Sequence, residues 1–117
     1  MPSNRTQSYL RDIHDAILAI QSFVSRMDLA TYEKDSRTQA AVERKLMVIS
    51  EAAIRLADEA EALCPVIPWR DIRGIGNWLR HQYDRVDGKM VWNTVQDDLP
   101  ALKEAVLRAL DHPPTSP

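Results

Sequence analysis

The stretch TQSYLRDIHDAILAIQSFVSRM, residues 6–27, decides the fold class of this chain. Its larger apolar residues recur at steps of three and four, which places them on one stripe of an α-helix. They are Leu10, Ile13, Ile17, Ile20, Val24 and Met27. Polar side chains fill most of the other side, and Ser3, Asn4 and Thr6 are each acceptable N-caps. The stripe keeps its register for about five turns and predicts one long amphipathic helix.

A second long helix is predicted after a short connection. Residues 28–35 favour a single short turn of helix, and Ser36 is the expected N-cap of the long helix that follows. Its buried side carries several small Ala residues, which let a neighbouring helix approach closely. The run Cys64–Pro68 ends this helix, because Pro lacks the amide hydrogen and disfavours helical geometry in the residue before it.

Two more helical stretches complete the pattern. The third runs from about Trp69 to about Tyr83, and the fourth has apolar residues at near-helical spacing from Val91 to Leu110. Pro100 either kinks the fourth stretch or begins a new helix there. Because no β-alternation or hairpin turn is present, we predict an all-α chain, an antiparallel up-and-down four-helix bundle with a short extra helical turn. One domain is expected over residues 1–111, followed by a disordered tail at 112–117.

Composition excludes several classes of protein. The 117 residues include a single cysteine, Cys64, which excludes an internal disulfide framework and a Cys-based zinc site and fits a reducing cytoplasm. No apolar run reaches the length of a membrane span, and no apolar leader follows Met1, so we expect a cytoplasmic protein. The net charge of −2 gives no global attraction to polyanions. Contact with nucleic acid therefore requires a local cluster of arginines.

Such a cluster occurs in WRDIRGIGNWLRHQY, residues 69–83. At about 100° per residue, Arg73, Asn77, Arg80, His81 and Asp84 share one side of the predicted helix. Arginine binds phosphate, and a histidine exchanges protons near neutral pH, so the strip suits chemistry on a phosphodiester. The alternative is an ordinary solvated helix face.

Two glycines in this helix argue against an ordinary solvated face. Gly74 and Gly76 each cost about 1 kcal/mol relative to Ala, which a helix tolerates where another backbone or a ligand comes close. Other candidate sites are weaker: no His or Cys pair has metal-ligand spacing, so neither metal nor cofactor is expected. Cys64 is expected to be a packed thiol, the Glu51 and Arg55 side chains a surface ion pair, and the three Trp residues core or interface groups.

At this helix the chain resembles the HepT-like toxins of the HEPN superfamily. The resemblance rests on residues 69–74, 77–83 and 86–87, with further support from 9–13, 49–52, 91–95 and 98–100. It implies a small all-α ribonuclease that works as a homodimer without a metal, the two motif helices flanking a shared cleft. The family motif is Arg, four to six residues, His, any residue, Tyr, and His81 and Tyr83 match its end.

The motif arginine has two candidates. Seven residues separate Arg73 from His81, Gly76 stands where the commonest family sequence has Arg, and Arg80 is adjacent to His81. Arg73, Asn77 and His81 are successive i,i+4 neighbours, so we expect the long Arg73 side chain to reach a phosphate held near His81, while Arg80 approaches from the flank. On this hypothesis His81 is the general acid or base, and Arg73 or Arg80, beside Asn77, stabilises the charge on the phosphate. The product would be a cyclic phosphate.

The resemblance also implies a partner. This is an MntA-like minimal nucleotidyltransferase antitoxin, as in type II or type VII toxin–antitoxin modules, which neutralises the toxin by transferring AMP to Tyr83. A larger complex with the antitoxin is a further expectation. Two alternatives remain: a dimeric RNA- or nucleotide-binding bundle that has lost cleavage, and a structural helical adaptor.

Overall fold

The computed structural model describes residues 3–81 and 87–111, and its regular secondary structure there is entirely helical. The longer helices are α1 (Asn4–Val24), α3 (Ser36–Leu56), α5 (Trp69–Arg80) and α7 (Leu99–Asp111). The shorter elements are α2 (Leu29–Lys34), α4 (Asp58–Leu63), α6 (Gly88–Asn93) and the π-helical segment η1 (Thr94–Asp98). The predicted all-α class is confirmed. The predicted tail at 112–117 lies outside the described residues.

Helix α1 follows its sequence pattern closely. Ser3 caps it, since the Ser3 side chain accepts a hydrogen bond of 3.0 Å from the amide of Thr6. The predicted stripe is buried along the length of the helix and forms a large part of the core. Only Met27 lies beyond the end of the helix, and it packs at the edge of the core.

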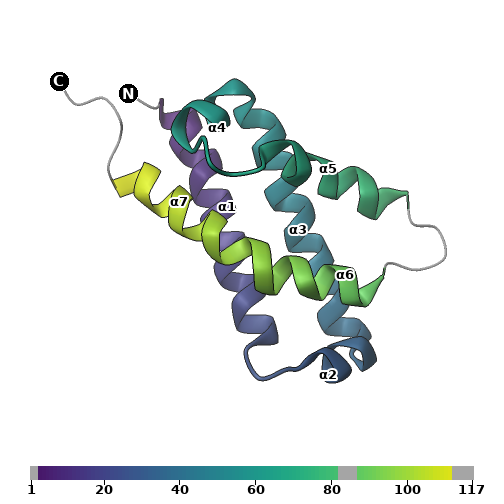
Figure 1. The fold of residues 1–117 in the computed structure, drawn as a ribbon. Helices are drawn as coiled ribbons and strands as arrows, with labels where there is room; N and C mark the ends of the chain where they lie inside the picture. Colours follow the sequence, from purple (N-terminus) through teal and green to yellow (C-terminus); the bar gives the residue numbers. More distant parts are fainter. Residues whose placement is uncertain (1–2, 82–86, 112–117) are drawn as a thin grey trace.

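The core lies between α1, α3 and α7. Helix α1 packs against both α3 and α7, and α5 packs on the outer side of α3 (Figure 1). Helix α2 closes one end of the molecule, while α4 lies at the opposite end, close to the start of α1. This arrangement leaves α5 dependent on α3 for most of its tertiary contacts.

The second predicted helix differs from the structure at both ends. Its N-cap is Asp35 rather than Ser36, because the Asp35 carboxylate accepts the Thr38 amide at 3.0 Å. The helix stops at Ala57 instead of continuing to Cys64, and α4 then starts in a new direction. Ala57 has a φ of 50°, a left-handed conformation that Ala adopts only at a cost. The predicted single helix is therefore wrong. The sequence around Ala57 carries no signal for a helix end.

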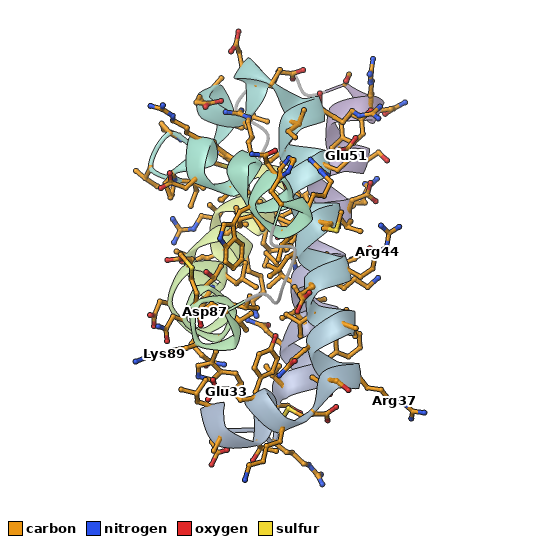
Figure 2. The ribbon with its side chains drawn as sticks, turned by 90° about the vertical axis from the view of Figure 1, so that its right-hand side faces the viewer. Glu33, Arg37, Arg44, Glu51, Asp87 and Lys89 are labelled. Atoms are coloured by element: carbon orange, nitrogen blue, oxygen red, sulfur yellow. The ribbon has the colours of Figure 1, made fainter. Side chains whose placement is uncertain are left out.

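The fourth stretch is one helical run with a π-helical interruption. Asp87 caps α6 by accepting the amides of Lys89 and Met90, and Figure 2 shows Asp87 and Lys89 beside Glu33 of α2. The Leu99 amide bonds to the carbonyl of Thr94, five residues back. Pro100, which has no amide hydrogen, directly follows this π-helical segment as the second residue of α7.

The aromatic and thiol side chains near the third helix are structural, as predicted. Trp69 is 1% exposed, and its indole Nε1 donates to the carbonyl of Cys64 at 2.9 Å. Burial raises the pKa of the Cys64 thiol, which stays protonated and packed. None of the helices in residues 3–81 and 87–111 has the length and hydropathy required to cross a membrane.

Candidate functional site

Helix α5 carries the polar strip that the sequence predicts. Asn77 and Arg80 are exposed, Arg73 is half-buried, and His81 caps the end of the helix with an exposed side chain. The His81 amide donates to the carbonyls of Asn77 and Trp78 at 3.2 and 3.3 Å, which closes the last turn. Tyr83 and Asp84, the other predicted members, lie outside the described residues. The exposed imidazole of His81 therefore lies at the C-terminal end of α5.

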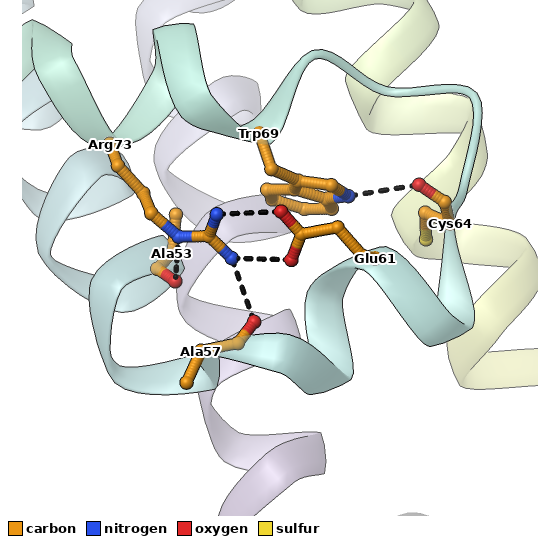
Figure 3. A network of polar contacts seen from close by, with 6 residues as sticks. All are labelled: Ala53, Ala57, Glu61, Cys64, Trp69 and Arg73. Carbon is orange, nitrogen blue, oxygen red and sulfur yellow. Dashed lines mark hydrogen bonds and ion pairs between the residues drawn. The ribbon is translucent and has the colours of Figure 1, made fainter.

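Arg73 is held by the neighbouring helices (Figure 3). Its Nη1 and Nη2 each donate to the Glu61 carboxylate at 2.7 Å, a bidentate ion pair. Nη2 also donates to the Ala57 carbonyl at 2.7 Å and Nε to the Ala53 carbonyl at 3.2 Å. These carbonyls lie at the end of α3, where a helix leaves its last carbonyl groups without partners. Arg73 thus caps α3 from a distant segment and fixes the corner between α3 and α4.

The contact between Arg73 and Glu61 shifts the pKa of both groups in the direction that favours their charged forms. The Arg73 hydrogen bond lowers the pKa of Glu61, and the Glu61 carboxylate raises the pKa of Arg73. Helix geometry places the Cα atoms of Arg73 and His81 about 12 Å apart along the axis. The guanidinium contacts Glu61 near the beginning of α5, whereas His81 is at its end. The structure therefore does not bring Arg73 and His81 together.

A buried hydroxyl joins α3 to α5 one turn further along. Ser50 is 1% exposed, and its Oγ donates to the Arg73 carbonyl at 2.8 Å and accepts from the Gly76 amide at 3.0 Å. A Cβ on residue 76 would lie 2.9 Å from this Oγ, closer than real side chains come. Gly76 is therefore required for the close approach of α3, as the sequence predicted for a glycine in this helix.

Arg80 lies over the same glycine. Its Nη1 would be 3.5 Å from a Cβ on residue 76, so the guanidinium folds back along the helix toward the contact between α3 and α5. Within residues 3–81 and 87–111 no acidic side chain or carbonyl oxygen pairs with it. Arg80, Asn77 and His81 fall within about 100° of arc on the last turn and a half of α5. The structure brings these three predicted residues together.

The other side of α5 borders an open groove of about 750 Å³, beyond which lie α6, η1 and α7. Its lining includes Gly74, Ile75 and Trp78 of α5. Val66 and Met90, also in the lining, are 86% and 52% exposed. A Cβ on Gly74 would meet no described atom within 4 Å.

The charged lining residues of this groove are Arg70, Arg108, Asp71, Asp97, Asp98 and Glu104. Acidic groups outnumber basic ones, so the groove is less suited to RNA than the Arg80 side.

Sequence reasoning missed two residues that shape this region, Ser50 and Glu61. The cost of Gly76 signalled a close approach but did not name its partner. No group of three or more His, Cys, Asp or Glu side chains suited to a metal is present in the described part of the chain. An imidazole, an amide and a guanidinium on one exposed helix end can exchange a proton and bind a phosphate.

Comparisons with known proteins match a region of the chain that includes α5. The family model described as "Ribonuclease HepT-like" matches residues 13–109. The chain is 37% identical over 97 residues to a Thermococcus cleftensis protein named "Probable ribonuclease HepT", covering 83% of this chain and 88% of that protein. A Methanocaldococcus jannaschii protein named as a "Putative RNase" is 29% identical over 110 residues, 91% of each chain. No solved structure shows a significant match.

Proposed function

The chain belongs to the ribonuclease HepT-like family, and from this membership we propose that it is an endoribonuclease that cleaves RNA without a metal ion. The observation that carries the proposal is the exposed His81 at the end of α5, inside the matched region and beside a guanidinium that has no acidic partner among the described residues. The name "Probable ribonuclease HepT" describes the Thermococcus cleftensis relative. The activity is extended to this chain because the matched region includes α5 and His81.

The proposed reaction uses the 2′-hydroxyl of RNA as the nucleophile. His81 accepts the 2′-hydroxyl proton or donates a proton to the departing 5′-oxygen. The 2′-oxygen forms a bond to phosphorus while the bond to the 5′-oxygen breaks, which leaves a 2′,3′-cyclic phosphate and a 5′-hydroxyl. A neighbouring arginine stabilises the negative charge that develops on the phosphate, and Asn77 offers an amide donor to the same group.

The experiment that tests this function is RNA cleavage in the presence of EDTA. Purified wild-type protein, His81→Ala and Arg73→Ala are incubated with the same RNA, and the product ends are identified by mass spectrometry. Wild-type cleavage with cyclic phosphate ends, lost in His81→Ala, is the expected result. Equal cleavage by His81→Ala would remove the assigned role of this residue.

The proposal includes a homodimer, and the groove beside α5 offers a surface for the second copy. The apolar side chains of Ile75 and Trp78 border it, and exposed Val66 and Met90 have no other cover among the described residues. Sedimentation at micromolar concentration should show a dimer. Gly74→Arg adds a charged side chain beside the groove, at a position where a Cβ meets no described atom within 4 Å, and should shift the protein toward monomer. Gly74→Ala is the matched control.

The proposal also includes the toxin role in a two-component module. A minimal nucleotidyltransferase of the MntA type would act as the antitoxin by adding AMP to Tyr83. The phenol oxygen would form a bond to the α-phosphorus of ATP. The bond from this phosphorus to the oxygen that bridges to the β-phosphate would break, and pyrophosphate would leave. The added negative charge would repel an RNA phosphate near His81. Co-expression should give a mass increase of one AMP group that Tyr83→Phe abolishes.

A second candidate function is supported by the state of Arg73. One of the two arginines proposed for the phosphate is occupied by Glu61, which favours an RNA-binding bundle without cleavage as the alternative. In that case the wild type and His81→Ala would bind RNA equally and neither would cleave it. The EDTA assay combined with a binding measurement separates the two functions.

A further inference from the structure

The two arginines of α5 have different surroundings. Every nitrogen of the Arg73 guanidinium donates a hydrogen bond, to the Glu61 carboxylate or to a carbonyl of Ala53 or Ala57. Moving this group onto an RNA phosphate would break the ion pair and two hydrogen bonds to carbonyls at the α3–α4 corner. Arg80 is exposed and makes no such contact within the described residues.

Position on the helix also favours Arg80. Its Nη1 lies 3.5 Å from the place of a Cβ on Gly76, at the edge of the contact between α3 and α5, so the guanidinium reaches back along the last turn of α5. Asn77 and His81 occupy the adjoining row, four residues apart, so an anion above Asn77 would lie near the guanidinium, the amide and the imidazole together. The last turn of a helix carries a partial negative charge, so an anion there needs a cation close by.

We propose that these two arginines have separate tasks: Arg80 binds the RNA phosphate beside Asn77 and His81, and Arg73 is a positioning residue that anchors α5 to the α3–α4 corner. The inference rests on the proposed ribonuclease function and identifies the cation of that site. Ser50 assists the same anchoring, because its hydroxyl bridges the Arg73 carbonyl and the Gly76 amide.

The first test measures RNA binding as a function of salt. The His81→Ala background removes cleavage, and a single-stranded RNA is the probe. Each lost phosphate contact lowers the slope of log K against log salt by about 0.7 for a single strand. We expect Arg80→Ala to lower the slope by about that amount, Arg80→Lys to restore it, and Arg73→Ala to leave it unchanged. A slope that falls in Arg73→Ala and not in Arg80→Ala would overturn the assignment.

The second test frees Arg73 without removing it. In Glu61→Gln the guanidinium loses its ion pair. If Arg73 is a positioning residue, this variant lowers the unfolding midpoint, as Arg73→Ala does, and leaves the salt slope at its wild-type value. If Arg73 instead binds phosphate, its release should raise both RNA affinity and slope, which would refute the proposal.

The outcomes separate this inference from the function on which it rests. In the chain with His81 intact, Arg80→Ala should lower kcat/KM for RNA cleavage by about 100-fold, the usual effect of removing a charge-stabilising donor. Wild-type cleavage with no effect of Arg80→Ala on slope or rate would overturn the inference and leave the ribonuclease standing. A slope change without any wild-type cleavage would overturn the ribonuclease and leave Arg80 as the phosphate ligand. Absence of RNA binding by the wild type would overturn both.

Discussion

The two glycines of α5 offer a matched pair of substitutions with opposite expected effects on stability. Both residues lie in the same helix, and neither has a positive φ, so alanine suits the backbone at both positions. They differ in what a Cβ would meet: nothing within 4 Å at Gly74, and the Ser50 Oγ at 2.9 Å and Cβ at 3.3 Å at Gly76. The comparison therefore isolates the contact between α3 and α5.

The expected magnitudes follow from these distances. Gly74→Ala should raise the free energy of unfolding by about 0.5–1 kcal/mol, the usual gain for Ala over Gly inside a helix. Gly76→Ala gains the same amount but displaces Ser50, whose two hydrogen bonds contribute about 1 kcal/mol each and whose buried hydroxyl then loses its partners. The net loss is about 1–2 kcal/mol, which places the two variants about 1.5–3 kcal/mol apart.

Urea unfolding followed by circular dichroism measures this difference. With a denaturant slope of about 1–2 kcal/mol per molar, typical of a small domain, the two midpoints should differ by about 1–3 M. In a Ser50→Ala background the penalty of Gly76→Ala should shrink, since the closest clashing atom is gone. A midpoint for Gly76→Ala as high as that of Gly74→Ala, or a penalty that Ser50→Ala leaves unchanged, would refute the role assigned to Ser50.

Three further predictions concern other contacts. The Tyr32 hydroxyl is buried without a partner among the described residues, so Tyr32→Phe should leave thermal stability unchanged or raise it by up to about 1 kcal/mol; a clear loss would reveal a partner. The Arg73 hydrogen bond lowers the pKa of Glu61 from its usual 4.5, so this ion pair stabilises the fold above that pH and its contribution fades as pH falls through the lowered value. The difference in unfolding midpoint between wild type and Glu61→Gln should therefore shrink under acid conditions, and a constant difference would contradict this explanation. Asp87→Ala should cost about 1 kcal/mol through the lost cap of α6, whereas Asp87→Asn should cost much less.

Local pattern was enough to predict the fold class and the polar strip. The stripe of α1 depends only on helix periodicity, and Arg80, Asn77 and His81 share a face for the same reason. The break at Ala57 could not be predicted, because Ala is a strong helix former and its left-handed conformation depends on packing and on the distant Arg73.

The same limit applies to the site. Spacing alone places Arg73 four residues from Asn77 and suggests that it can reach a phosphate near His81. Its actual partner, Glu61, lies in a different helix, and only the tertiary fold brings the two together. The glycine signal was correct at Gly76, while Gly74 meets nothing among the described atoms.

The attachment of α5 mainly to α3 has a consequence for local opening of the native chain. Ser50 and Arg73 fasten it to α3 at two points about one turn apart, and the groove lies on its other side. Amide hydrogens in α5 should then exchange with solvent deuterium as one cooperative unit with the second half of α3, at a rate independent of α7. Loosening either fastening would accelerate exchange along the helix as far as His81, so the orientation of the imidazole depends on a hydroxyl and an ion pair that lie outside the proposed RNA site.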